Sequence, residues 1–365
     1  MTHADLIVIG ASFAGLACAR AAARAGLRVR VIEKKARSGA KLHTTGILVK
    51  DAIDTLPWLQ EVPTDLVRTI RGVRLYAPNL QSVDLQAPGY YFWATDTPAL
   101  LDWMVGCCER EGVRFDFNTV FEQAQPVAGG WQVACREREL VTAAYLVGAD
   151  GPQSRVAKAL GLEVNQAFLF GVEHEYTTAR LAPDRLHCFI DRQLAPGYIG
   201  WGVAGVGVQQ VGLARRVGTA GQAACVDALA RLRHKIADHV DTLGRTPAAV
   251  RAGMIPCGGS LRRVARERAL LVGDAAGMVS PVTAGGIRTA LHHGDAAGTA
   301  ISYFLRHQGA DPAGDLAATY PRFRTKRLLR WLFEHTLSDH LFNLLLHTRP
   351  VRRAAELVYF HRRGQ

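Results

Sequence analysis

Three glycine-bearing segments, far apart in the chain and in a fixed order, constrain this sequence more than any other feature. The first, Val8 to Gly15, reads VIGASFAG; the second, Tyr145 to Gly151, reads YLVGADG; the third, Leu271 to Gly277, reads LVGDAAG. Each begins in a short apolar run typical of a buried parallel strand. Because ligands of open α/β sheets bind beyond the carboxyl ends of the strands, the segments predict one extended site at one sheet edge.

The first segment has the properties of a phosphate-binding turn. Asp5 to Ile9 predicts a strand and Leu16 to Ala25 an alanine-rich helix. The turn between them brings phosphates to a helix N-terminus, where N–H groups and the helix dipole favour anions, although Ser12 replaces the middle glycine of the usual fingerprint. A second strand, Arg28 to Ile32, ends at an acid about twenty residues further on, which accepts ribose hydroxyls. The expected dinucleotide contacts are Gly10, Ser12, Phe13, Ala14, Gly15, Glu33 and Lys34.

The second and third segments resemble motifs of flavoproteins built like the aromatic hydroxylases. Asp150-Gly151 resembles their DG motif, and Gly273-Asp274 resembles their GD motif, whose aspartate contacts the ribityl hydroxyls of FAD. Either aspartate alone could be a helix N-cap. Gly285-Gly286-Ile287 opens a predicted helix, Arg288 to Leu305, whose N-terminus can stabilise negative charge on the reduced flavin ring. The resemblance implies non-covalent FAD, with these further contacts: Thr45, Gly46, Val120, Asp150, Gly151, Gly273, Asp274, Thr283, Gly285, Gly286 and Ile287.

Within that superfamily, most of the chain is similar to the geranylgeranyl reductase family. Pro256 to Gly286 resembles the family's stretch IP…LLVGDAAG…SP.T..GI, and Ala195 to Trp201 resembles its block PGGYAWVFP. The sequence departs from the family where Trp201 is followed by Gly-Val-Ala rather than Phe-Pro, and where the loop Lys41 to Ile47 lacks a cysteine near the flavin. Both departures fall where substrate meets flavin, so the resemblance implies the fold and cofactor rather than the substrate.

The order of the motifs predicts an α/β fold in which a Rossmann-type FAD-binding domain carries an inserted β-sheet-rich substrate domain and a C-terminal helical tail. We assign residues 1–70, 96–162 and 251–310 to the FAD-binding domain, 71–95 and 163–250 to the substrate domain, and 311–365 to a basic helical region. The insert contains alternating apolar runs, which predict a sheet with one solvated face and one face over the flavin ring. These runs are Gly72 to Tyr76, Phe168 to Tyr176, Leu186 to Ile190, Tyr198 to Val203 and Gln210 to Ala214.

Positive charge is concentrated in the C-terminal region. The chain has 44 basic and 32 acidic residues. Leucines and aromatic residues alternate with the basic ones at helical spacing, which suits a helix lying on an anionic membrane. Alternatively, the apolar face packs on the domain and the arginines are solvated. No nucleic-acid recognition motif accompanies the charge, so we expect no such partner. The basic residues of this region are Arg322, Arg324, Lys326, Arg327, Arg330, Arg349, Arg352, Arg353, Arg362 and Arg363.

The remaining composition bears on location. No apolar run approaches the roughly 18 residues that span a bilayer, and the first residues lack the cationic start of an export signal. The 7 cysteines show no metal-ligand spacing and suit a reducing compartment. We expect a cytoplasmic protein without a bound metal, which would be peripheral on the inner face of the membrane if the C-terminal helix lies on it; the oligomeric state stays open.

These features favour an FAD-dependent oxidoreductase. In the favoured version, reduced FAD delivers a hydride to a C=C bond of a hydrophobic, isoprenoid-type substrate, and His43, Tyr198 or water donates the proton. The sequence has no second dinucleotide fingerprint, so NAD(P)H or another reductant would bind only transiently. Two alternatives remain: a monooxygenase that acts through a flavin hydroperoxide, and a flavin-bearing protein that binds lipid or a partner without turnover.

We expect the substrate pocket between the flavin and the sheet carrying Tyr198 and Trp201, and we expect it to be long and apolar. Residues three apart on a regular strand point to opposite faces. Gly200, which lies between the two aromatic residues, therefore predicts a β-bulge that turns both toward the cavity.

Overall fold

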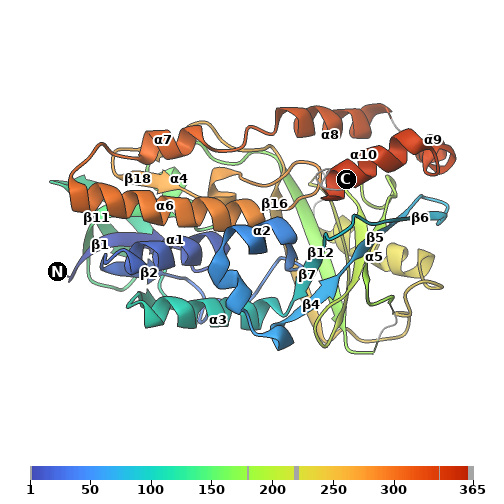
Figure 1. Cartoon of the computed structure of the whole chain (residues 1–365), viewed down its shortest axis with the longest axis horizontal. Helices are drawn as coiled ribbons and strands as arrows, with labels where there is room; N and C mark the ends of the chain where they lie inside the picture. The colour runs from blue at the N-terminus through green and yellow to red at the C-terminus, as the bar shows by residue number, and fades with distance from the viewer. Residues whose placement is uncertain (1, 179–180, 218–221, 337, 361–365) are drawn as a thin grey trace.

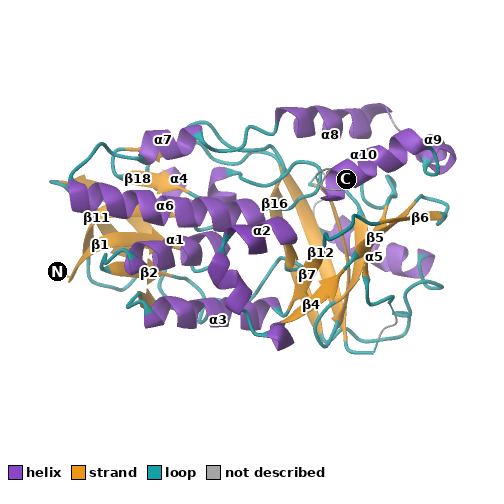
Figure 2. Ribbon diagram, in the orientation of Figure 1, coloured by secondary structure: helices purple, strands orange, loops and turns teal. Residues whose placement is uncertain are grey.

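The computed structural model describes residues 2–178, 181–217, 222–336 and 338–360. Figure 1 shows an elongated molecule whose two halves lie end to end. The half nearest the N-terminus combines helices with one sheet, and the other half is built on a second sheet with helices at its outer side, as the colouring of Figure 2 makes clear. The predicted α/β fold class, with its inserted sheet and helical C-terminal region, is confirmed.

The first sheet brings the three glycine-bearing segments to one edge. Its main path is β17-β18-β11-β1-β2-β8, with β10 and β9 attached beside β11. The pairs β1–β2, β1–β11, β11–β18 and β2–β8 are all parallel. The strands that precede the three glycine-bearing segments are therefore neighbours. The strands are β1 (Thr2–Ile9), β2 (Val29–Ile32), β8 (Arg114–Asp116), β9 (Phe121–Val127), β10 (Gly130–Cys135), β11 (Val141–Gly148), β17 (Ala265–Arg266) and β18 (Ala269–Leu271).

Helices α1 and α6 pack together unusually closely on this sheet. Two glycines of α6 make the approach possible: a Cβ on Gly294 would lie 2.3 Å from the carbonyl oxygen of Ala14, and one on Gly298 would lie 2.2 Å from that of Cys18. The close packing fixes the N-termini of both helices beside the sheet edge. The helices of this half are α1 (Phe13–Arg24), α2 (Lys50–Thr55), α3 (Thr97–Arg110), α4 (Arg155–Ala159), α6 (Ile287–His307) and α7 (Ala313–Ala318), with 3-10 turns at Pro57–Glu61, Thr64–Leu66 and Gly273–Ala276.

The second sheet has seven strands in the order β16-β12-β15-β14-β13-β5-β6. Each predicted apolar run forms one of its strands. The strand of this sheet that comes last along the chain is β16, which continues to Pro256. We therefore move the proposed boundary of the substrate domain from 250 to 256. A separate three-stranded sheet, β3-β7-β4, lies between the halves. The strands are β3 (Ile47–Val49), β4 (Val67–Ile70), β5 (Gly72–Tyr76), β6 (Ser82–Leu85), β7 (Phe92–Thr95), β12 (Phe168–Tyr176), β13 (Arg185–Phe189), β14 (Gly200–Ala204), β15 (Gln209–Arg216) and β16 (Ala249–Pro256).

The expectation of one solvated sheet face is wrong. Helix α5 (Ala223–Lys235) buries Leu229 and Leu232 in one cluster with Val172 and Leu213 of the sheet. The strands are consequently buried on both sides, and their apolar runs are nearly continuous rather than strictly alternating.

The expected β-bulge at Gly200 is wrong as well. Tyr198 lies in a bend before β14, and the pairing of β14 with β13 and β15 runs from Gly200 onward without a register shift. The bend, not a bulge, brings Tyr198 toward Trp201.

The C-terminal helices α8 (Arg324–Thr336), α9 (Asp339–Leu345) and α10 (Arg349–Phe360) lie over the outer part of the second sheet (Figure 1). Phe342 and Phe360 are buried in one cluster with Leu75 and Phe92. Helices α9 and α10 are therefore packed on the domain, as one of the two alternatives expected, whereas α8 keeps Leu328 57 % exposed. Arg362 and Arg363, and the side chains of Phe333 and Glu334, lie outside the described residues.

Candidate functional site

A large cavity lies where the sheet edge of the first half meets the second sheet. Its volume is about 1190 Å³, above the roughly 300–1,000 Å³ of ordinary ligand pockets. The cavity therefore has room for a large cofactor and a second molecule. Of the residues predicted for the site, all except Gly15 line it: Gly10, Ser12, Phe13, Ala14, Glu33, Lys34, His43, Thr45, Gly46, Val120, Asp150, Gly151, Tyr198, Trp201, Gly273, Asp274, Thr283, Gly285, Gly286 and Ile287.

Gly15 does not line the cavity but allows close packing against the turn that does. A Cβ at this position would lie 1.9 Å from the carbonyl oxygen of Gly10, so only glycine allows α1 to start this close to the turn. The N-cap Ser12 makes no side-chain hydrogen bond to the first turn of α1. The N–H groups at this helix end are thus not capped by a side chain and can bind the phosphates of a ligand.

Glu33 organises the same turn. Its Oε2 accepts a hydrogen bond from the backbone N–H of Ala11 at 2.8 Å, and its Oε1 accepts one from Lys35 N–H at 3.0 Å. Each carboxylate oxygen can accept a second hydrogen bond. The side chain can therefore hold the turn and still accept ribose hydroxyls, which stays a prediction.

Asp274 has the properties of a ligand-binding carboxylate. Within the described part of the chain no donor contacts its side chain, and burial alone raises its pKa to about 6. Its Oδ1 lies beside the start of α6, because a Cβ on Gly286 would be 3.2 Å from it. A half-buried carboxylate that faces a cavity without a protein partner fits the hydroxyl groups of a ribityl chain.

Asp150, by contrast, is largely occupied by the protein. Its Oδ1 accepts from Ser154 Oγ at 2.6 Å, and its Oδ2 accepts from the backbone N–H groups of Arg155 and Val156 at 2.7 and 3.1 Å. The carboxylate therefore binds the first turn of α4, although the N-cap residue of this helix is Ser154 and not Asp150, as one alternative had expected. Only its remaining lone pairs can face a ligand.

The two side chains predicted as proton donors are not well suited to that role. His43 is exposed to the cavity, yet desolvation by the surrounding walls and the charges of Lys35 and Lys34 lower its pKa, so the ring is neutral at neutral pH. The Tyr198 hydroxyl donates a hydrogen bond to the carbonyl oxygen of Thr283. Burial also raises the pKa of Tyr198.

Sequence reasoning missed Glu173, a buried carboxyl in the cavity wall. Its Oε2 accepts hydrogen bonds from Thr45 Oγ1 at 2.5 Å and from the indole N–H of Trp201 at 2.6 Å. Its Oε1 is buried and has no hydrogen-bond partner among the described residues, and burial raises the pKa of the group. The signal was present: Glu173 and Glu175 are two apart in an apolar strand and so share one face.

Glu175 carries the other half of this buried network. It forms an ion pair with Arg251 at 2.6 Å, and Arg251 in turn donates to the carbonyl oxygen of Thr44 at 2.7 Å. The cavity loop 44–45 is therefore held from two adjacent strands of the second sheet.

The C-terminal helices were not expected in the cavity wall. Arg330, counted above among the residues for membrane binding, is buried and donates to the carbonyl oxygens of Pro281 at 2.7 Å and Gly197 at 2.9 Å. This guanidinium fastens α8 to the loop before α6 and to the bend that carries Tyr198. Six large apolar residues of α8, α9 and α10 also line the cavity: Leu329, Leu332, Phe342, Val351, Leu357 and Val358.

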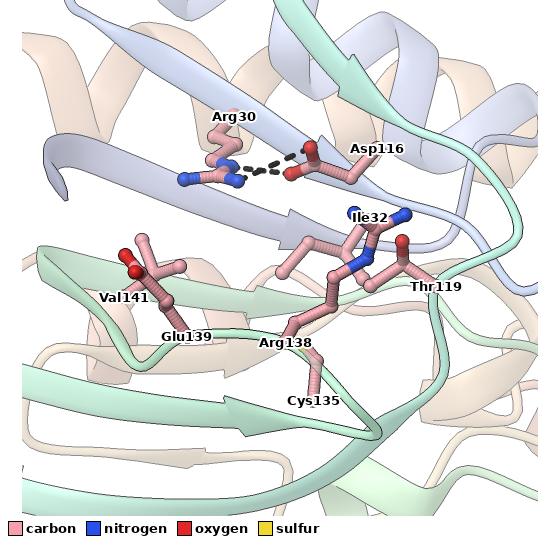
Figure 3. A pocket seen from close by; sticks show the side chains of 8 residues that line it. All are labelled: Arg30, Ile32, Asp116, Thr119, Cys135, Arg138, Glu139 and Val141. Atoms are coloured by element: carbon pink, nitrogen blue, oxygen red, sulfur yellow. Dashed lines mark hydrogen bonds and ion pairs between the residues drawn. The ribbon is translucent and has the colours of Figure 1, made fainter.

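A second, small cavity of about 180 Å³ lies beneath β2 and β8 (Figure 3). At its rim Arg30 pairs with Asp116, and the side chains of Arg138 and Glu139 line it as well. The two arginines are matched by two carboxylates, so the small cavity has no net charge with which to select an ion. Among the described residues no cluster of His, Cys, Asp and Glu could hold a metal, and none of the described helices is both long and apolar enough to cross a bilayer.

The chain resembles known proteins over nearly its whole length. Residues 3–330 match the family model described as FAD binding domain. A digeranylgeranylglycerophospholipid reductase 2 from Methanopyrus kandleri is 27% identical, with 83% of this chain and 81% of the relative covered. A digeranylgeranylglycerophospholipid reductase from Methanothrix thermoacetophila is 26% identical, with 94% and 90% covered.

Solved structures share the fold. A geranylgeranyl bacteriochlorophyll reductase-like protein from Thermoplasma acidophilum superposes with a TM-score of 0.84 at 18% identity, covering 99% of this chain and 98% of that one. A probable FAD-dependent monooxygenase from Pseudomonas aeruginosa has a TM-score of 0.70 at 20% identity, covering 98% and 100%.

Proposed function

The chain belongs to the FAD binding domain family, and from this premise we propose that it reduces C=C bonds in a hydrophobic, isoprenoid-type substrate. The family match confirms the expected non-covalent FAD and the expected class of FAD-dependent oxidoreductase. The relatives' names confirm the resemblance to geranylgeranyl reductases. They also make geranylgeranyl chains of glycerophospholipids candidate substrates for this chain.

The observation that carries the proposal is the continuity of the FAD site with an apolar channel. Beyond the cofactor loops the cavity wall is formed by side chains such as Leu75, Phe170 and Ile190 from the sheet and by leucines of the C-terminal helices. A long hydrocarbon chain can desolvate along this wall, and each buried CH₂ group contributes about 0.8 kcal/mol.

The residues that would hold FAD fall into three groups. The uncapped N–H groups of α1 suit the pyrophosphate, Glu33 suits the adenosine ribose, and Asp274 suits the ribityl chain. The N-terminus of α6, at Gly286, suits the electron-rich end of the ring. When bound and reduced, FAD supplies the hydride, and NAD(P)H or another transient donor would supply the electrons.

We assign the proton to Glu173 rather than to His43 or Tyr198. Burial raises the pKa of the Glu173 carboxyl and so favours its protonated form, and its Oε1 has no hydrogen-bond partner among the described residues. The carboxylate left after proton transfer would be stabilised by the Thr45 hydroxyl and the Trp201 indole. Trp201 thus both lines the substrate channel and orients the acid.

Anaerobic single turnover tests the proposed reaction. The FAD-loaded protein is photoreduced without oxygen and mixed with geranylgeraniol or with its fully saturated analogue as the matched control. We expect oxidised flavin absorbance to return only with the unsaturated alcohol, together with a product two mass units heavier for each bond reduced. Reoxidation that needs oxygen and yields a hydroxylated product would establish the monooxygenase alternative. Binding of both alcohols without any turnover would establish the binding-protein alternative.

A further inference from the structure

Three leucines of the C-terminal helices both line the large cavity and are exposed. Leu329 and Leu332 of α8 and Leu357 of α10 line the cavity, and the same three side chains are 39 %, 38 % and 43 % exposed. We place a mouth of the cavity at these side chains. Lys326 and Arg330 of α8 line the cavity too, so this part of its wall is mostly apolar with two basic side chains.

The surface around this mouth is unusually apolar. Seven of the fourteen large hydrophobic side chains that the described surface exposes belong to α8, α9 and α10. Leu328 and Leu344 are the most exposed of these leucines, and Leu341 adds to the same region. Clustered exposed leucines on one region of a protein indicate an interaction surface, whereas single ones are common.

Positive charge surrounds the same helices. Six arginines of this region are exposed: Arg322, Arg324, Arg327, Arg349, Arg352 and Arg353. The only acidic side chains described on these helices are Asp339 and Glu356, and Glu356 forms an ion pair with Arg352 at 3.2 Å. Exposed leucines and exposed arginines on the same helices match the acyl chains and anionic headgroups of a bilayer surface.

We propose that α8 and α10 form a membrane-docking surface whose leucine-lined mouth faces the acyl chains, so that a lipid substrate enters the cavity directly from the bilayer. The route of the substrate rests on the proposed function; the docking itself does not. Arg330 supports this surface from the inside of the molecule. Its hydrogen bonds attach α8 to the cavity loops and so fix the position of the mouth relative to the site.

Vesicle sedimentation tests the docking. The FAD-loaded full chain is mixed with saturated phosphatidylglycerol vesicles or with saturated phosphatidylcholine vesicles, so no reducible substrate is present. We expect binding to phosphatidylglycerol that weakens with salt. The double variant Arg324→Glu, Arg327→Glu should lower the partition coefficient at least about tenfold. Arg68→Glu, Arg114→Glu, the same charge change at exposed arginines of β4 and β8, should bind like the native chain.

Insertion of the leucines is tested with a fluorescent label. All seven native cysteines are buried, so a polarity-sensitive thiol dye will label Leu328→Cys selectively. We expect a blue shift of the dye on phosphatidylglycerol vesicles, and none for the control Val226→Cys, which is 50 % exposed on α5. Retained flavin absorbance verifies that each variant is folded.

Three outcomes would overturn the proposal. These are the absence of binding at low salt, equal binding by both charge variants, and equal dye shifts at positions 328 and 226. If Leu328→Asp, Leu344→Asp instead converts a dimer into monomers while no form binds vesicles, the surface joins two copies of the chain. Failure of the reductase assay with normal vesicle binding would reject the proposed reaction alone.

Discussion

Replacing Asp274 by asparagine should stabilise the FAD-free protein and weaken FAD binding at the same time. Burial raises the pKa of this carboxyl from its ordinary value of 3.8 to about 6. The folded state therefore binds a proton more tightly than the unfolded state, and holding the ionised group in the wall costs free energy above pH 6. At roughly 1.4 kcal/mol per pH unit, the difference of about two units corresponds to about 3 kcal/mol. The cost is fully present above pH 6 and disappears as the pH falls toward 4.

The pH dependence of this cost can be measured by chemical denaturation. The free energy of unfolding of the FAD-free native chain is compared with that of Asp274→Asn from pH 4.5 to 8. We expect the variant to gain up to about 3 kcal/mol at pH 7.5 and most of that gain to vanish at the acid end. FAD titration should show the opposite effect, a loss of roughly 10- to 100-fold in affinity, because a charged hydrogen bond is worth about 1.5–3 kcal/mol.

Asp150→Asn is the matched control, because that carboxylate already accepts three hydrogen bonds from Ser154 and the start of α4. Burial raises the pKa of Asp150 as well, but these hydrogen bonds oppose the shift, so the gain of this variant should be clearly smaller than that of Asp274→Asn. The reasoning would be refuted if Asp274→Asn were destabilised at pH 7.5, or if its difference from the native chain did not change with pH.

Three further predictions follow from other contacts. Glu173→Gln should retain FAD and slow flavin reoxidation by substrate; native turnover should fall as the pH rises through the raised pKa of Glu173, and the variant should lose this pH dependence. Gly294→Ala places a methyl group 2.3 Å from Ala14 O and should cost about 1–3 kcal/mol or more in denaturation experiments, whereas Gly314→Ala, with open space around it, should be neutral or stabilising. Arg330→Met removes two hydrogen bonds to carbonyl oxygens; limited proteolysis should then cut near α8 faster while the flavin spectrum stays unchanged, and equal cleavage rates would show that the guanidinium does not hold the helix.

Local pattern was sufficient to predict the sheet edge and the cofactor-binding loops in the cavity wall. Glycine turns and strand-ending aspartates are short-range signals, and the parallel pairing of β1 with β2 and β11 then brings them together. The solvated sheet face was wrong because α5, a helix from the same insert, covers it, and no local signal shows where a helix packs. The bulge at Gly200 was wrong because Tyr198 had been assigned to the strand, whereas the chain bends before β14 begins.

Contacts between distant segments explain what the sequence did not reveal at the site. Glu173 looks like one polar residue in an apolar strand, and its importance depends on Thr45 and Trp201, which come from other elements. Likewise, Arg330 reads as one of many C-terminal arginines until its bonds to Pro281 and Gly197 are seen. Asp150 and Asp274 occur in similar motifs but have different surroundings, because only Asp150 accepts hydrogen bonds from the start of a helix.

The fastening of α8 by Arg330 has a consequence for the protein during its synthesis. Translation finishes the cofactor loops, up to Gly286, before α8, α9 and α10 leave the ribosome. The nascent chain can therefore acquire its flavin while the apolar channel still lacks one wall. Until α8, α9 and α10 emerge, the open channel exposes apolar side chains. Such surfaces bind chaperones and promote aggregation. The order of residues along the chain thus makes the proposed docking helices follow the cofactor loops during synthesis.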